Sequence, residues 1–219
     1  MLNKLKDKLE QAAEEARASV RRIEEAFDDP LARQTDWRPA NRGGTNTRSR
    51  TLKAVSPERL AFKAAAGPLL IAGAAVATGA FLALKSFFAA GGTVSTEVFI
   101  GGSIAAVGLL LGYWFTRPIV LDKQTGLCWK GHRAPKSESA ARDQANAAVL
   151  SDVGAVQVIG ERVSGSKGRS YRSFEINLVL RDGSRLNLVD HAKQEAIRAD
   201  AQRLGEFLGV PVWDASGLS

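Results

Sequence analysis

The most informative pattern in this chain is a pair of long apolar runs, Ala64–Leu84 and Val98–Thr116, neither of which contains a charged residue. As a helix, each run would be about 30 Å long, which matches the hydrocarbon core of a bilayer. Backbone polar groups are satisfied there only within helices or closed barrels. We therefore predict two membrane-spanning helices joined by a short turn. The alternative is a pair of buried helices in a soluble protein, although such helices usually have a polar face.

The distribution of charge predicts how these spans are oriented. The net charge is +7, and Lys and Arg are concentrated between residue 30 and the first run and again just after the second. The turn at residues 85–97 has one charge of each sign. Because positively charged loops stay on the cytoplasmic side, we expect both termini in the cytoplasm. Residues 1–27 contain no apolar run of the kind that a cleaved signal peptide needs, so the first span is expected to act as the insertion signal.

Apolar residues recur at steps of three and four from Leu2 to Phe27, with charged residues between them. This pattern predicts an amphipathic helix over residues 1–29, which Pro30 ends. The helix has three interpretations: packing on its own domain, a weak coiled coil, or lying on the membrane. Its even mixture of acidic and basic residues favours packing or self-association. Residues 30–46 contain several Gly, Pro and Arg residues, and we expect a basic linker there.

The remaining pattern is that of short strands followed by one helix. Two strands precede the hairpin, in residues 47–63, and about five follow it in residues 117–214. A helix from about residue 192 is ended by Gly209. Seven antiparallel strands and one C-terminal helix give an α+β fold with the element order of a pleckstrin-homology-like (PH-like) barrel. The transmembrane hairpin of residues 64–116 would interrupt this barrel, so that strands before it pair with strands after it.

Parts of the chain also resemble a known group of proteins. The segments that carry the resemblance are YRSFEINLVLRDG, LGVPVWD, Trp37-Arg-Pro, Gly43-Gly44 and Val120-Leu-Asp-Lys-x-x-Gly126. Over roughly residues 37–214 the chain resembles uncharacterised bacterial proteins with two transmembrane helices and a PH-like cytoplasmic domain. The resemblance implies a multi-pass protein of the bacterial inner (plasma) membrane, and it implies no particular activity.

Small residues on the second run are candidates for helix packing. Gly108 and Gly112 have the small-xxx-small spacing that lets helix backbones approach closely in lipid. The predicted packing face consists of Gly101, Ala105, Gly108 and Gly112, and the residues expected to oppose it are Gly73, Ala77 and Ala80. Packing within one hairpin is favoured because the turn is short. The alternative is an interface between two copies of the chain.

A basic turn in the C-terminal half is a candidate site for anionic lipid headgroups. Its residues are Arg162, Lys167, Arg169 and Arg172. Each Lys or Arg near an anionic membrane surface contributes about 1 kcal/mol to the attraction between the protein and that surface. The alternative is a solvated hairpin with no ligand. No nucleic acid is expected as a partner, because the basic residues are interleaved with acidic ones and concentrated beside the membrane.

No motif for catalysis, a cofactor or a metal ion is found. Two distant histidines, His132 and His191, and the single cysteine, Cys128, are too few to enclose a metal ion. We expect Asp190 to cap the last helix rather than to orient a catalytic base, and Trp213 to plug the end of the barrel.

The sequence therefore predicts a membrane-anchored binding module and not an enzyme. Its cytoplasmic PH-like domain would engage a protein partner or anionic lipid headgroups. The alternative is an oligomerising scaffold that uses the N-terminal helix and the small residues of the second span.

Overall fold

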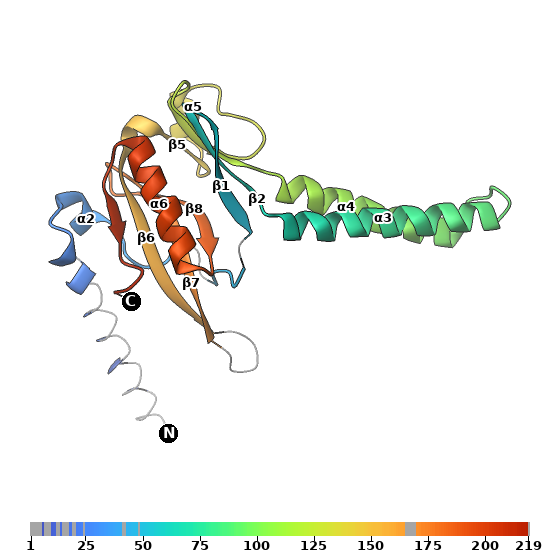
Figure 1. Ribbon diagram of the computed structural model, residues 1–219, viewed down its shortest axis with the longest axis horizontal. Coiled ribbons are helices and arrows are strands. Elements are labelled where there is room, and N and C mark those ends of the chain that lie inside the picture. The colour runs from blue at the N-terminus through green and yellow to red at the C-terminus, as the bar shows by residue number, and fades with distance from the viewer. Residues whose placement is uncertain are drawn as a thin grey trace. The chain divides into compact units, whose positions relative to one another are not determined.

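A computed structural model shows the arrangement of the chain (Figure 1). It describes residues 6, 10, 11, 14, 18, 21–23, 25–40, 43–47, 49–164 and 170–218. The chain divides into two compact units. We call residues 49–124 with 129–134 the hairpin unit, and residues 1–48 with 125–128 and 135–219 the sheet unit.

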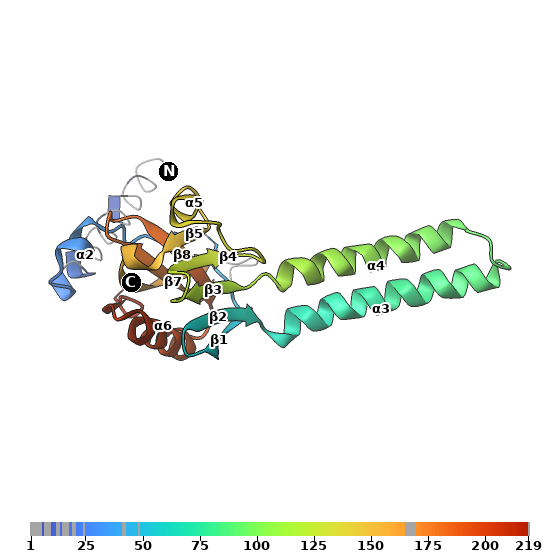
Figure 2. The ribbon, with the colours of Figure 1, turned by 90° about the horizontal axis from the view of Figure 1, so that it is seen from above.

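The hairpin unit contains short strands and two long helices. Its elements are β1 (Arg50–Ser56), β2 (Arg59–Ala64), α3 (Ala66–Ala89), α4 (Thr96–Phe115), β3 (Ile119–Asp122) and the end of β4 (Leu127–Lys130). Strand β2 pairs antiparallel with both β1 and β3, with Arg59 opposite Asp122 and Phe62 opposite Ile119. The two helices are therefore inserted between neighbouring strands of one sheet, and they lie side by side (Figure 2).

The two helices that the apolar runs predict are present, although their ends are shifted. Helix α3 begins at Ala66 and continues through Lys85 to Ala89. Helix α4 includes Glu97 in its first turn, where a carboxylate interacts favourably with the helix dipole. By length and composition, both helices are long and apolar enough to cross a membrane.

The sheet unit is built on a four-stranded sheet in the order β8-β7-β6-β9. Its elements in chain order are α2 (Pro30–Gln34), α5 (Glu138–Arg142), β5 (Ala147–Val149), a 3-10 turn (Leu150–Asp152), β6 (Val153–Ser164), β7 (Ser170–Leu180), β8 (Arg185–His191), α6 (Gln194–Leu208) and β9 (Val212–Asp214). Strand β7 pairs antiparallel with β6 and β8, whereas β9 pairs parallel with β6. Trp213 is therefore a buried residue of an edge strand and does not plug the end of a barrel.

The second sheet has five strands in the order β1-β2-β3-β4-β5. The predicted α+β class, with two apolar helices and antiparallel pairing, is confirmed. The strands that the structure describes form two open sheets, and no closed barrel is found among them. They also outnumber the predicted seven, because β5 and β9 each have only 3 residues, too few to show a period.

Helix α6 has the predicted apolar stripe and the predicted end. Ile197, Ala201 and Leu204 are buried, and Gly209 ends the helix in the left-handed conformation with φ of 73°. The start of the helix differs from the prediction, because Asp190 belongs to β8 and does not cap it. The N-cap residue is Lys193, which makes no side-chain cap, and its own backbone N–H donates to His191 Nδ1 at 2.9 Å.

Candidate membrane and binding surfaces

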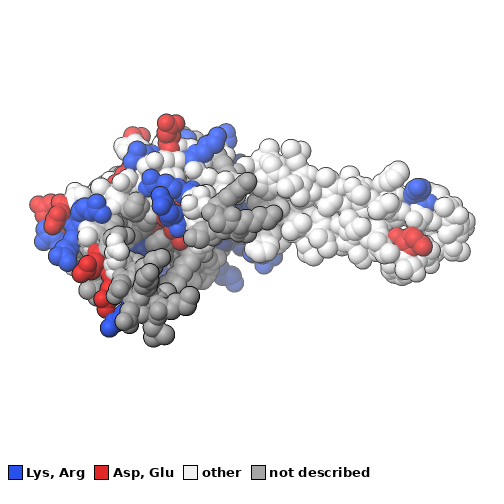
Figure 3. All heavy atoms as spheres, turned by 90° about the horizontal axis from the view of Figure 1, so that it is seen from below, with Lys and Arg blue, Asp and Glu red and all other residues white. Residues whose placement is uncertain are grey.

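The α3–α4 hairpin has an exposed apolar surface. Only 11% of the residues in the most apolar stretch of each helix are buried. Large side chains are open to the surroundings, including Leu70 (72% exposed), Phe88 (74%) and Leu110 (68%). Figure 3 shows this face of the hairpin as an uncharged surface apart from charged side chains near its tip. A core helix of a soluble protein would be mostly buried, and an exposed apolar surface of this extent is typical of a membrane or protein interface.

Glycine residues hold the two helices in close contact. A Cβ atom on Gly79 would lie 2.3 Å from the backbone nitrogen of Ala105. A Cβ atom on Gly101 would lie 2.5 Å from the backbone nitrogen of Ala83. The same construction on Gly108 also meets the α3 backbone. Because backbone atoms cannot rotate away, a side chain at any of these positions would force the helices apart.

The predicted packing residues of α4 lie within this contact or beside it. Those on α4 are Gly101 and Gly108, which are buried, and Ala105 and Gly112, which are half-buried. The opposing residues on α3 include Ala72 and Gly79. Of the residues expected there, Gly73 and Ala77 are exposed and Ala80 is half-buried. The prediction misplaced this face because α3 is apolar on all sides, so no polar side in the sequence fixes its rotation. The structure thus uses the small residues of α4 within one hairpin.

Basic side chains gather where the hairpin meets its strands, a place we call the hairpin root. Its cations are Arg50, Lys63, Arg117 and Arg133, and His132 lies among them. The register places Arg50 opposite Ala64, the last residue of β2. A backbone hydrogen bond of 2.8 Å from Gly131 N–H to Pro118 O brings the segment with His132 beside the end of α4. Residues from four separate segments therefore meet at the root.

Tyr113, in the last turn of α4, organises the hairpin root. The His132 ring lies 4.7 Å from the Tyr113 ring, and its Nε2 is 3.2 Å from the Tyr113 carbonyl oxygen. The Arg117 guanidinium lies 5.5 Å from the centre of the same ring. Arg50 donates a hydrogen bond from Nη1 to the Arg117 carbonyl oxygen, and burial lowers the pKa of Arg50. These contacts place cations at the C-terminal end of a helix, where the helix dipole favours them.

Only part of the predicted headgroup turn is described. Arg162 and Arg172 lie opposite each other on β6 and β7, and both are exposed. Arg172 donates a hydrogen bond from Nη2 to the Ser216 carbonyl oxygen at 3.0 Å, and its guanidinium lies 5.5 Å from the Phe174 ring centre. Lys167 and Arg169 lie outside the described residues. The structure therefore brings together two of the four residues.

The segment predicted as a basic linker is held against the four-stranded sheet. We call residues 36–40 and 43–45 the strap. Both carboxylate oxygens of Glu175 accept hydrogen bonds from the Ala40 N–H, at 2.9 and 3.1 Å. The Ser173 hydroxyl accepts one from the Thr45 N–H at 2.9 Å. Side chains of β7 therefore satisfy strap amides that would otherwise need water or another strand.

A buried polar network lies beneath the strap. Asn177 Nδ2 donates to Glu175 Oε1 at 2.7 Å and to Gln157 Oε1 at 3.1 Å. Arg185 donates from Nη1 to the same Gln157 oxygen at 3.2 Å and lies 3.9 Å from Glu175. Burial lowers the pKa of Arg185, and the carboxylates of Asp36 and Glu175 oppose this effect. Gln157 also donates from Nε2 to the Asp36 carbonyl oxygen at 3.2 Å, so the network holds the strap, although the buried Asn177 Oδ1 accepts no hydrogen bond from the described residues.

Aromatic side chains fix the start of the strap. The Phe27 ring stacks on Trp37 with centres 5.2 Å apart, and Trp37 contacts Trp213 at 5.9 Å. Ile23 is buried in the same cluster. The end of the predicted N-terminal helix thus packs on its own sheet, the first of the three interpretations. The described residues from Lys6 to Ala26 are helical, and the others of that helix lie outside the described part of the chain.

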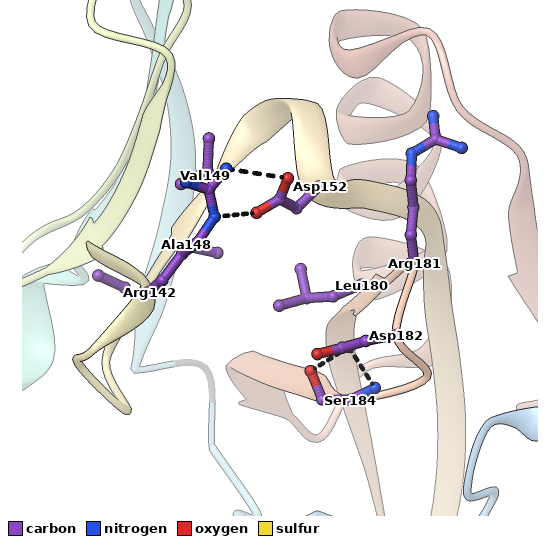
Figure 4. Close-up of a pocket in the computed structure, with 9 residues that line it drawn as sticks. Arg142, Ala148, Val149, Asp152, Leu180, Arg181, Asp182 and Ser184 are labelled. Carbon is purple, nitrogen blue, oxygen red and sulfur yellow. Dashed lines mark hydrogen bonds and ion pairs between the residues drawn. The ribbon is translucent and has the colours of Figure 1, made fainter. Parts of the chain in front are cut away.

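A cavity of about 400 Å³ lies in the sheet unit (Figure 4). It is lined by Arg142, Ala147, Ala148, Val149, Asp152, Leu180, Arg181, Asp182 and Ser184. Figure 4 shows the Asp152 carboxylate facing Arg142, at 2.8 Å, and Asp182 facing Ser184. Its best-placed polar groups already pair with one another, so the lining defines no particular ligand.

The described residues include no group of three or more His, Cys, Asp and Glu side chains placed to hold a metal ion. Cys128 is buried in β4, His132 belongs to the hairpin root and His191 is buried at the end of β8. No protein-family model matches the chain, and no curated protein matches it.

Proposed function

We propose that this chain is a multi-pass protein of the bacterial inner membrane, anchored by the α3–α4 hairpin. The observation that carries the proposal is the exposed, uncharged surface of two helices that pack on each other through glycine. In water such a surface would be strongly unfavourable, whereas in lipid it is the expected outer surface of a helix pair. Both termini are cytoplasmic in this proposal, because the root of the hairpin is basic and its tip is electrically balanced.

The proposed biochemical role is binding without catalysis. The folded part of the chain is a PH-like domain that engages a protein partner or anionic lipid headgroups at the cytoplasmic surface. Two sheets with mainly antiparallel pairing, and one amphipathic helix near the C-terminal end of the chain, support the PH-like assignment. The alternative, an oligomerising scaffold, has less support, because Gly101 and Gly108 are occupied within the hairpin and Ile23 packs on its own sheet.

Cysteine labelling tests the membrane topology. Cys128, the single cysteine of the chain, is buried. In a Cys128→Ser background, a single introduced cysteine is therefore the only thiol that a reagent can label. Val94 lies in the exposed turn between the helices, and Lys136 is an exposed residue of the sheet unit. A membrane-impermeant maleimide should label V94C in intact cells and K136C only after permeabilisation. Labelling of K136C in intact cells, or recovery of the protein without membranes, would refute the proposal.

Crosslinking mass spectrometry of the gently extracted protein tests the binding role against the scaffold. Crosslinks from the sheet unit to another protein or retained anionic lipid support the binding module. Crosslinks only between copies, through residues 2–27 or α4, support the scaffold.

A further inference from the structure

The hairpin root combines cations, aromatic rings and the end of a spanning helix in one place. Lys63, Arg117 and Arg133 are exposed there, and none of them forms an ion pair with any carboxylate that the structure describes. Tyr113 (58% exposed) and Trp114 (63%) lie in the last turn of α4, a few residues before Arg117 in the sequence. Aromatic rings of this kind sit at the level of lipid headgroups.

The acidic residues of the hairpin unit are far from this root. Its only Asp and Glu residues are Glu58, Glu97 and Asp122. Glu58 and Asp122 are each five residues along the chain from a root cation, about 16 Å for an extended chain. Asp122 is moreover occupied by Arg59, whose Nε lies 3.0 Å from its carboxylate. Since the Debye length in physiological salt is about 8 Å, these acids do little to neutralise the root.

We infer that the hairpin root binds the phosphate groups of anionic phospholipids in the cytoplasmic leaflet. This inference rests on the proposed membrane insertion and adds a ligand and a site to it. Once α3 and α4 span the bilayer, Lys63 and Arg117 lie within three residues of the helix ends, at the depth of the headgroups. Arg and Lys bind phosphate oxygens with charge-assisted hydrogen bonds. The site differs from the turn of Arg162 and Arg172, which belongs to the sheet unit.

The part of the site around Tyr113 is preorganised. Arg117 is held over the Tyr113 ring, and its own carbonyl accepts a hydrogen bond from Arg50. His132 also contacts Tyr113: the two rings pack together, and His132 Nε2 lies within hydrogen-bond distance of the Tyr113 carbonyl oxygen. Cations already fixed beside the membrane lose less side-chain entropy when a phosphate binds.

The test uses the full-length chain in nanodiscs of phosphatidylcholine with roughly one phosphatidylglycerol in three, a composition that gives the surface a negative potential. After mild detergent extraction, mass spectrometry counts the two lipids that remain bound. The wild type should retain phosphatidylglycerol preferentially. In the root variant K63Q/R117Q/R133Q this preference should be at least about tenfold weaker, since the variant removes three cations that attract anionic headgroups.

A matched control removes the same charge elsewhere. Lys53, Lys136 and Arg203 are exposed and form no ion pair with the described residues, so K53Q/K136Q/R203Q should keep the wild-type preference. The charge-conserving variant K63R/R117K/R133K should keep most of the preference for phosphatidylglycerol. This variant distinguishes a loss of charge from a loss of folding. Equal retention of both lipids by the wild type, or an unchanged preference in the root variant, would overturn the inference.

Two further results separate this inference from the proposed function. Failure of the wild type to enter nanodiscs contradicts membrane insertion itself. Insertion without any lipid preference contradicts only the headgroup site. Glycerol phosphate, added to protein in pure phosphatidylcholine, should not raise the unfolding temperature. Protection as strong as that given by phosphatidylglycerol would identify a soluble phosphate ligand and overturn the assignment to lipid.

Discussion

Replacing Gly101 by Ala should destabilise the protein, whereas the same change at the next residue should not. The added Cβ at position 101 would lie 2.5 Å from Ala83 N, 2.8 Å from Gly79 O and 2.9 Å from Ala83 Cα. Ordinary contact begins at 3.4 Å, so the closest contact is too short by about 0.9 Å. All three atoms belong to the backbone. The two helices must therefore separate, and their interdigitated contacts weaken.

The magnitude follows from two opposing effects. Overpacking a well-packed contact costs about 1–3 kcal/mol. Replacing Gly by Ala inside a helix contributes up to about 1 kcal/mol in the opposite direction. Gly102→Ala has only this second effect, because a Cβ there meets no atom within 4 Å. The two variants should differ by about 1–3 kcal/mol, with G101A the less stable.

Thermal unfolding of the two variants, measured in one detergent, gives this difference directly. For a chain of this length, about 1 kcal/mol corresponds to 2–4 °C in Tm, so a separation of several degrees is expected. Gly73→Ala on α3 is a second control, because its Cβ also meets open space. If G101A and G102A unfold at the same temperature, the close packing of α3 on α4 is wrong.

Three further predictions concern the strap. Glu175→Ala should cost about 1–3 kcal/mol in chemical unfolding, because it leaves the Ala40 amide without its acceptor and removes one of the two carboxylates near Arg185. Glu161→Ala should cost little, and equal costs would argue against the network. Gly44→Ala should speed hydrogen exchange at the Thr45 amide, because a Cβ at position 44 would lie 2.4 Å from Cβ of Ser173, whose hydroxyl accepts the Thr45 hydrogen bond. The same change at the exposed Gly217 should leave this exchange rate unchanged. Chiefly through a hydrogen bond from Arg38, folding lowers the pKa of Asp36, so its charged form stabilises the fold above its unfolded pKa and this contribution is lost on acidification. D36N should therefore be less stable than the wild type near pH 7 and converge with it below about pH 4, and a constant difference across this range would contradict the assignment.

The hairpin could be predicted from the sequence because its signal is local and long. Two uncharged runs of sufficient length identify α3 and α4 without reference to any other part of the chain. Their rotation about their own axes could not be predicted, since small and large apolar residues occur on every side. The contact of Gly79 with Ala105 depends on which side of each helix meets the other, and only the packed pair determines it.

The strap could not be predicted, because the residues that hold it are distant in sequence. Ala40 is bound by Glu175, 135 residues later. The alternation of Ser173, Glu175 and Asn177 with apolar residues along β7 is typical of a strand with one polar face. That face is nevertheless buried, with Glu175 only 4% exposed. Trp37 is the one local signal, since a tryptophan in a polar segment usually has an apolar surface to cover.

The glycine contacts also explain how a helix pair can be inserted between two paired strands. Neighbouring strands lie about 4.8 Å apart, whereas packed helices usually have axes 8–10 Å apart. Only Ala65 connects β2 to α3, and only residues 116–118 connect α4 to β3. Such short connections leave little slack to absorb the difference. Close approach of α3 and α4 through Gly79, Gly101 and Gly108 reduces this mismatch, so helix packing and the pairing of β2 with β3 stabilise each other. The small residues of the hairpin are therefore required by the sheet beneath it as well as by the helices themselves.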